Sequence, residues 1–201
     1  KNFMPVTING NGSITGLSVG GLGAGVVNTA TLADGAATGV KQGAGSVIQV
    51  VQVTHGNQVS TTGTSYVDTG LSASITPNST SSKILVIVTQ RFFIKRSTDQ
   101  ARGGFRLLRG STVILQGPNT SSGTEPGGEG FSSGNGPSAI QVAGAYSCSF
   151  LDSPSTTSAT TYKTQFANNQ SSASPTIYVN GTNVTTGDDG VSTMTLFEVT
   201  A

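Results

Sequence analysis

The sequence predicts an all-β protein: a jelly-roll or β-sandwich head of about eight to ten antiparallel strands that follows a Gly-rich N-terminal stalk. Composition is the first reason, because the 201 residues include 28 Gly and no Trp, and only 9% are charged. Glu, Lys, Arg, Leu and Met are rare while Gly, Thr and Ser are abundant, which disfavours a helical bundle. From residue 46 onward, apolar residues recur with a period of two between turn-forming residues, as in strands with one buried face.

The first 46 residues differ from the rest, because eleven of the 28 glycines lie there and apolar residues are sparse. Such a segment cannot bury enough apolar surface by itself to offset the entropy lost on ordering. We therefore divide the chain into a stalk or linker, 1–46, and a β-sandwich head domain, 47–201. A short helix is predicted near 31–41, where Leu32, Ala36 and Val40 share helical spacing. Two alternatives stay open for this segment: a flexible linker, or a stalk that packs around a threefold axis.

The first half of the head contains six predicted strands. The run 47–55 alternates and ends at a His-Gly-Asn sequence, and the runs 66–67 and 71–75 precede the turn signal Thr76-Pro77-Asn78. The run 84–94 is the strongest. Its first five residues are apolar on both faces, as in the inner layer of a sandwich or at a subunit contact. The runs 105–109 and 112–115 are joined by Gly110-Ser111, which indicates a hairpin.

The second half of the head contains four more predicted strands: 140–151, 162–167, 176–179 and 191–199. The first of these alternates over a long span. Tyr146, Cys148 and Phe150 share its apolar face, while Ser147 and Ser149 share the other. Strand–helix alternation is lacking throughout, so an α/β sheet is disfavoured.

The residue inventory excludes several kinds of site. One Cys and one His cannot build a zinc site or an internal disulfide, and we expect Cys148 to be a small core hydrophobe. We expect His55 to be structural or exposed, since no nucleophile elbow accompanies it. The Gly-rich run 20–25 misses the spacing of a dinucleotide-binding loop, and the chain contains no Gly-Lys for a phosphate loop. No cofactor is predicted.

Charge and hydropathy also limit the partners. Ten basic and nine acidic residues give a net charge of +1, whereas a nucleic-acid-binding domain normally has a clear basic excess. No apolar run approaches the roughly 20 residues that span a membrane. We therefore expect neither nucleic-acid binding nor membrane insertion.

Segments in both units resemble parts of bacteriophage tail fibres. The C-terminal module of such fibres is similar to residues 45–52, 60–68, 71–77, 81–86, 150–154 and 158–162, and their linker repeats are similar to residues 31–38. The resemblance covers most of the chain. It implies a homotrimeric fibre tip whose jelly-roll head is similar to tumour-necrosis-factor-like trimers.

The same resemblance implies a virion protein on the exterior of the phage tail or capsid. Its N-terminal end would attach to other tail or capsid proteins, and its head would recognise a bacterial surface glycan during host adsorption. Two alternatives remain. The chain could be a head fibre or decoration protein with a purely structural docking role, or a polysaccharide-degrading tailspike.

The tailspike alternative depends on whether the sequence offers a suitably placed pair of carboxyl groups. Glycoside hydrolysis needs two carboxyl groups about 5–9.5 Å apart across a cleft. Asp188 and Asp189 are the only adjacent pair, and the Asp-Gly step that follows them indicates a turn. Glu125 and Glu129 lie in a Gly-rich segment that is poorly suited to a preorganised site. We therefore expect no enzymatic activity and no metal site, with Asp188 and Asp189 as a weak candidate for calcium.

A basic cluster is the most distinctive polar feature, since six of the ten basic residues fall between Arg91 and Arg109. Arginine forks favour bidentate contacts with phosphate or carboxylate groups of surface glycans. The alternatives are a solvated hairpin or an interface with another subunit. The segment 117–138 is also too long for an ordinary connection, and its one large apolar residue could stack on a sugar. The predicted receptor-binding residues are Arg96, Arg102, Arg106, Arg109 and Phe131.

Overall fold

The structure is a computed structural model that describes residues 7–8, 14–15, 43–96, 101–117, 129–132, 140–169, 175–181 and 190–201. The chain divides into two units, Lys1–Gln42 and Gly43–Ala201, of which the second is the head. In the first unit, β1 (Thr7–Ile8) and β2 (Ile14–Thr15) form an antiparallel pair. The predicted helix near 31–41 lies outside the described residues.

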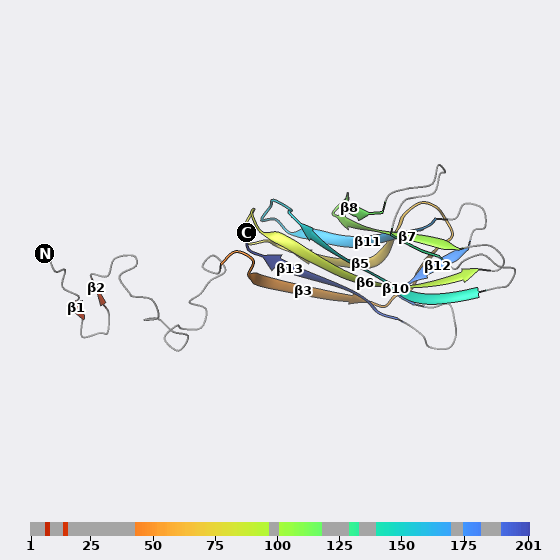
Figure 1. The fold of residues 1–201 in the computed structure, drawn as a ribbon, viewed down its shortest axis with the longest axis horizontal. Coiled ribbons are helices and arrows are strands. Elements are labelled where there is room, and N and C mark those ends of the chain that lie inside the picture. Colours follow the sequence, from red (N-terminus) through yellow and green to blue (C-terminus); the bar gives the residue numbers. More distant parts are fainter. Residues whose placement is uncertain are drawn as a thin grey trace. The chain divides into compact units, whose positions relative to one another are not determined.

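The head consists of two antiparallel sheets, which confirms the all-β sandwich prediction (Figure 1). In the first sheet, β6 (Lys83–Arg96) pairs with β10 (Ile140–Asp152) on one edge, and with β13 (Ser192–Val199) and β12 (Thr176–Val179) on the other. β3 (Val47–His55) pairs with β13, and β4 (Val59–Thr61) pairs with β12. The second sheet has the order β5 (Val67–Ile75), β11 (Thr160–Asn168), β7 (Arg102–Arg109) and β8 (Thr112–Gln116), and β9 (Glu129–Ser132) also pairs with β7.

The order of the longer strands is that of a jelly roll. One sheet holds β3, β13, β6 and β10, and the other holds β5, β11, β7 and β8. Along β3, β5, β6 and β7 the chain changes sheet at every step, and it does so again along β8, β10, β11 and β13. One side of the sandwich is closed where β3 lies beside β5, while β8 and β10 are the edge strands of the opposite side.

The strand pattern of the head differs from the sequence prediction in three places. β4 and β9 are too short to show a period of two. Because β9 lies within 117–138, the expectation of one long loop there is wrong, and that strand pairs with the first half of β7. The runs 66–67 and 71–75 join as the single strand β5, in which Gly70 has a φ of 82°. Glycine enters this left-handed region without strain. The gap between the two predicted runs therefore corresponds to a backbone irregularity within one strand.

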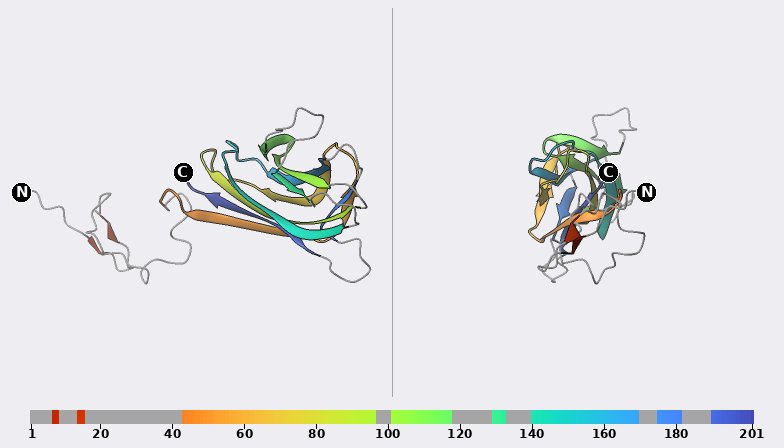
Figure 2. Two further views of the ribbon diagram at one scale, coloured as in Figure 1. Left: turned by 45° about the vertical axis from the view of Figure 1, so that its right-hand side comes forward. Right: turned by 90° about the vertical axis from the view of Figure 1, so that its left-hand side faces the viewer.

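The two ends of the head differ in what they carry. One end of the head holds both Gly43 and the C-terminal residue Ala201, and we call it the basal end. There the backbone N of Gly45 donates to Thr200 O at 2.8 Å, and Thr200 N donates to Ser46 O at 3.0 Å. The turns after β5, β7 and β10 also lie at this end, whereas β3, β4, β6, β9 and β11 all end toward the opposite, apical end (Figure 2).

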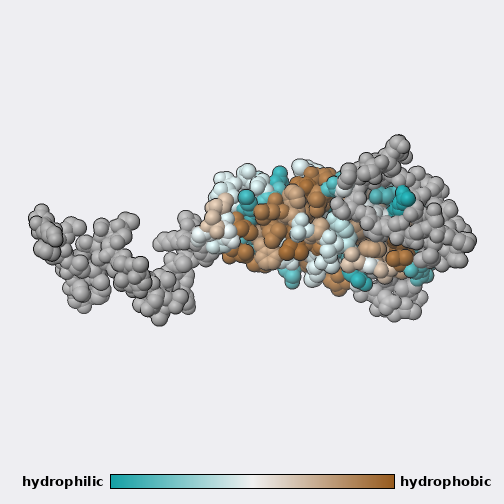
Figure 3. Space-filling model, in the orientation of Figure 1, coloured by the Kyte–Doolittle hydropathy of each residue, from teal (hydrophilic) through white to brown (hydrophobic). Residues whose placement is uncertain are grey.

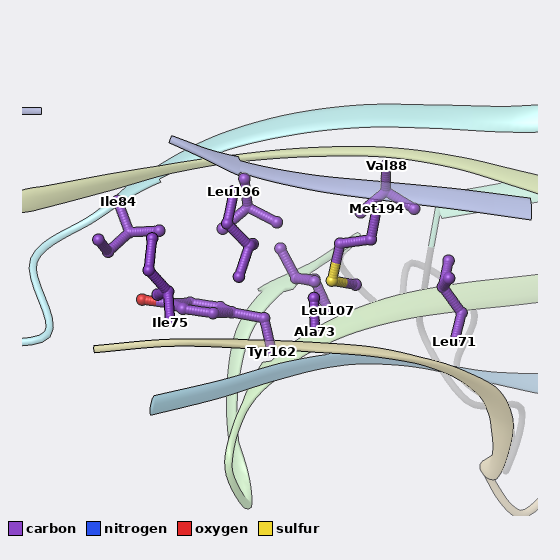
Figure 4. Close-up of a cluster of buried hydrophobic side chains, with 10 residues drawn as sticks. Leu71, Ala73, Ile75, Ile84, Val88, Leu107, Tyr162, Met194 and Leu196 are labelled. Carbon is purple, nitrogen blue, oxygen red and sulfur yellow. The ribbon is translucent and has the colours of Figure 1, made fainter. Parts of the chain in front are cut away.

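Two apolar clusters fill the sandwich, and each fully buried Val, Leu, Ile, Phe or Met side chain contributes about 1.5–3 kcal/mol relative to exposure. In the larger, basal cluster, side chains of the two sheets point toward one another (Figure 4). Its members are Leu71, Ala73, Ile75, Ile84, Val86, Val88, Leu107, Tyr162, Met194 and Leu196. The apical cluster comprises Ile94, Ala101, Phe105, Phe166, Ile177 and Val179, against which Val59, Val67, Phe92 and Tyr146 pack.

Candidate functional site

A layer of buried polar side chains lies between the two apolar clusters. Gln90, on β6, is fully buried at its centre. Its Nε2 donates to Asn180 Oδ1 and to Ser192 Oγ, each at 2.7 Å, and its Oε1 accepts from Thr164 Oγ1 at 2.8 Å. Thr164 belongs to the opposite sheet, so this amide joins both sheets. A buried polar group is costly unless it is hydrogen-bonded, and here both amide hydrogens and the carbonyl are satisfied.

Asn180 links the connections of the apical half to this layer. The residue is buried, follows β12 and has a φ of 70°. Its Nδ2 donates to Asn57 O at 2.8 Å and to Thr69 O at 2.7 Å. At the other end of the β12–β13 connection, Ser192 Oγ accepts from Arg91 N at 2.9 Å. The same buried groups therefore hold both stems of that connection, which starts from fixed positions.

Arg106 lies on the outer face of the second sheet, over Tyr66. Its Cζ is 4.0 Å from the centroid of the Tyr66 ring, and its Nε and Nη2 donate to Gln165 Oε1 at 2.9 and 2.6 Å. Burial raises the pKa of Tyr66, and the nearby guanidinium charge opposes that shift. These contacts hold Arg106 in one orientation on the sheet.

Arg109 points into the basal end of the sandwich, on the same face of β7 as Leu107. Its Nη1 donates to both carboxylate oxygens of Asp152 at 2.8 Å, and Asp152 is only 6% exposed. The Tyr162 hydroxyl donates to the same carboxylate at 2.7 Å. Burial and this hydrogen bond raise the pKa of Tyr162. The three side chains close the basal end of the core.

The predicted receptor-binding residues do not gather into one patch. Arg102 is exposed at the apical start of β7, and Arg96 ends β6 at the same end of the head. Arg109 lies seven residues beyond Arg102 on the same strand, or roughly 23 Å away at about 3.3 Å per residue. Phe131 lies on β9 opposite Gly103. The side chains of Arg96 and Phe131 lie outside the described part of the head.

The carboxylates considered for catalysis or calcium binding lie largely beyond the described residues. This holds for Asp188, Asp189 and Glu125, and for the side chain of Glu129. Within the described ranges, no group of three or more His, Cys, Asp or Glu side chains could hold a metal ion. Nor does that part of the chain contain a helix long and apolar enough to cross a membrane. His55 is partly buried at the end of β3, against Gly70.

The outer face of the first sheet carries an apolar band. Its main row runs across four paired strands through Val50, Phe197, Leu85 and Leu151. Val50 is 56% exposed, Leu151 50% and the neighbouring Ile87 40%. Figure 3 shows apolar residues gathered over the half of the head that carries the C-terminus. We call these five residues the apolar band. Its one sequence signal is the run 84–88, which is apolar on both faces.

The outer face of the second sheet is polar instead. Lys163 Nζ lies 2.9 Å from Asp68 Oδ2 there, and Ser74 and Thr161 share a hydroxyl hydrogen bond of 2.7 Å. Ser72, between Asp68 and Ser74, is also exposed. This face therefore suits contact with water, whereas the apolar band does not.

Comparison with known proteins identifies no family. No protein-family model matches the chain, and no curated protein matches it. Among solved structures, a chain in the structure of infectious bursal disease virus, Gx strain, is 17% identical with a TM-score of 0.30. The match covers 76% of this chain and 37% of that chain. This chain thus spans well under half the length of that viral chain, and the likeness is too weak to support a functional conclusion.

Proposed function

We propose that this chain is a virion structural protein, a bacteriophage tail fibre whose β-sandwich head binds a glycan of the host cell surface. The observation that supports this function best is the opposite placement of chain ends and connections on the head. Gly43 and Thr200 lie at the basal end, whereas the connections after β3, β4, β6, β9 and β11 start at the apical end. A head attached through its N-terminal side would present those connections to the host. The resemblance of six head segments to tail-fibre modules favours the same function.

In this proposal the head is part of a homotrimer, and it binds the glycan without catalysing a reaction on it. Arg96 and Arg102 are the residues that we assign to receptor contact, because both lie at the apical end. Arg106 and Arg109 are already engaged, with Gln165 and Asp152 respectively. Each head can bind weakly, since several copies on one particle multiply the affinity.

Adsorption to host cells tests the proposal. We expect the fluorescently labelled full chain to bind cells of the host bacterium saturably. Exchanging Arg96 and Arg102 together for Ser should weaken binding about tenfold or more, because hydrogen bonds to charged groups contribute about 1.5–3 kcal/mol each. Lys83→Ser is the matched control, an exposed cation at the basal end.

The alternatives give different results in the same assay. A chain that joins the particle but binds no host cells is a head fibre or decoration protein. Release of oligosaccharides from host capsule or lipopolysaccharide would identify a polysaccharide-degrading tailspike. Binding that is equal for the double variant and Lys83→Ser would remove the two arginines from the receptor contact.

A further inference from the structure

We infer that the apolar band of one chain is covered by a second copy of the same chain, which contributes the side of its sandwich between β8 and β10. This inference rests on the trimer proposed above and specifies which two surfaces meet in it. It follows from three features of the described head: the band itself, a partly open seam in the core, and an edge strand with little protection against pairing.

The apolar band lacks the features of a solvated sheet face. It places Val50, Phe197, Leu85 and Leu151 in one row, without a charged side chain between them. In an antiparallel sheet with one solvated face, the outward positions are normally polar. Three residues of the band are at least 40% exposed, which is unfavourable by about 25 cal/mol per Å² of apolar surface.

A second apolar surface lies where the sandwich is open. On the closed side, β3 lies beside β5. On the other side, Ile114, Leu115 and Phe150 pack against the basal cluster yet stay only partly buried. Val113, next to them on β8, is 39% exposed. We call these four residues the open seam. A surface that covered it would bury these four side chains further.

β10 forms the border of both surfaces. Among the described strands it pairs with β6 alone, so its second edge has no strand beside it. Exposed edges of this length usually carry Lys, Pro or inward charges that block further pairing. The 13 residues of β10 contain none of these except Asp152 at the end. Between Gln141 and Leu151, its exposed positions are occupied by Ala143, Ala145, Ser147 and Ser149, and such small side chains allow another sheet to approach closely.

The two surfaces lie at the same level of the head. Phe150 of the open seam is opposite Val86, next to Leu85 of the band, and Val113 is opposite Leu108 near the basal end. Two copies that stand side by side with their basal ends together can therefore bring seam and band into contact. Because the two surfaces differ, the contact is heterologous, and it repeats until a ring closes. A closed ring leaves no band and no seam exposed.

Disulfide cross-linking tests which surfaces meet. Val50→Cys and Val113→Cys are combined in the full chain after Cys148→Ala removes the native thiol. Val50 and Val113 lie on edge strands at opposite sides of one sandwich, too far apart for an internal disulfide. Mild oxidation should therefore give covalent trimers on a non-reducing gel. Val50→Cys with Ser72→Cys is the matched control, since Ser72 lies on the polar face, and it should give no trimer.

A charge in the band gives an independent measurement. Val50→Asp should reduce the native mass by light scattering threefold, from three chains to one, while Ser72→Asp leaves it unchanged. Both positions are exposed, so unfolding temperatures of the two variants should stay close to that of the parent chain.

The outcomes separate this inference from the trimer itself. A parent chain with the mass of one 20.2 kDa polypeptide overturns both. A trimer that survives Val50→Asp and forms no Val50–Val113 cross-link overturns the inferred contact and leaves the trimer standing. Dimers formed by Val50→Cys alone would show that the band meets another band, which also overturns it.

Discussion

The basal and apical halves of the head are built differently, although the long strands β5, β6, β7, β10 and β11 contribute to both. The basal half combines the larger apolar cluster, the apolar band and a two-residue turn at Gly110-Ser111. The apical half has a smaller, more aromatic cluster, in which the Phe105 ring stacks on Tyr146 at 5.1 Å, and it carries the connections after β3, β4, β6, β9 and β11. The polar layer around Gln90 separates the two halves.

The difference shows how one sandwich can serve two purposes. An apolar basal half favours assembly, because its outer face and its core seam both gain from being covered. The apical half depends on hydrogen bonds from buried, neutral groups such as Gln90 and Asn180, which fix the stems of connections. We therefore expect changes at the apical tips to leave the basal half intact. Four substitutions probe this division, in order of decreasing effect.

Gln90→Leu should have the largest effect on stability. It leaves Asn180 Oδ1 without its donor and removes the acceptor of Thr164, and each buried unsatisfied group costs about 1–3 kcal/mol. We expect the free energy of unfolding in urea to fall by about 3–4 kcal/mol. Thr89→Val, at the next position on the outer face, should change it by less than about 0.5 kcal/mol. Amide hydrogen exchange should rise first at Arg91 and Asn180, whose N–H groups donate within this layer; a uniform rise through both halves would contradict the separation.

Asp152→Ala probes the basal end and should cost less. It leaves Arg109 and the Tyr162 hydroxyl without their shared partner. Breaking a buried ion pair costs about 3–5 kcal/mol, but the Arg109 side chain is 30% exposed, so we expect about 2–3 kcal/mol. The control is Asp68→Ala, which breaks the exposed pair with Lys163 and should cost at most about 1 kcal/mol. If Asp152→Ala and Asp68→Ala lowered the thermal unfolding temperature equally, the basal ion pair would contribute no more to stability than the exposed pair.

Gly70→Ala probes the irregular position in β5, near the apical end of that strand. The positive φ at Gly70 costs an L-residue about 1–2 kcal/mol, and a Cβ there would also overlap the His55 ring. The free energy of unfolding should fall by about 2 kcal/mol. Gly43→Ala is the control, because a Cβ at Gly43 meets nothing. A loss limited to about 1 kcal/mol would show that His55 moves aside at little cost and that the positive φ accounts for the effect.

Alkaline unfolding should reveal the smallest effect, through Tyr162. Its pKa is raised in the folded head by burial and by the hydrogen bond to Asp152. The folded state therefore keeps this proton where the unfolded chain loses it, so stability falls as the pH rises above the ordinary tyrosine pKa of about 10. We expect a loss of about 1 kcal/mol between pH 9 and pH 11. Tyr162→Phe should flatten this slope, and an unchanged slope would assign it to other groups.

The candidate site could be predicted only in part. The cluster of basic residues between Arg91 and Arg109 is evident in the sequence, and it suggested one receptor-binding patch. In the fold these basic residues are separated from one another, because β6 and β7 belong to different sheets and the two ends of β7 are far apart. The polar layer had no sequence signal: Gln90, Asn180 and Thr164 are ordinary residues in separate strands, and only their convergence makes them a network.

The sequence by itself determined the fold class and most of the strands, because a period of two and turn-forming residues are local properties of the chain. It could not show the pairing of β9 with β7, or that β5 continues through Gly70. Only the tertiary structure decided which outward residues form a row. Val50, Leu85, Leu151 and Phe197 are neighbours solely through strand pairing over long sequence separations. Such pairing depends on how the sheets pack as a whole, and local periodicity carries no information about it.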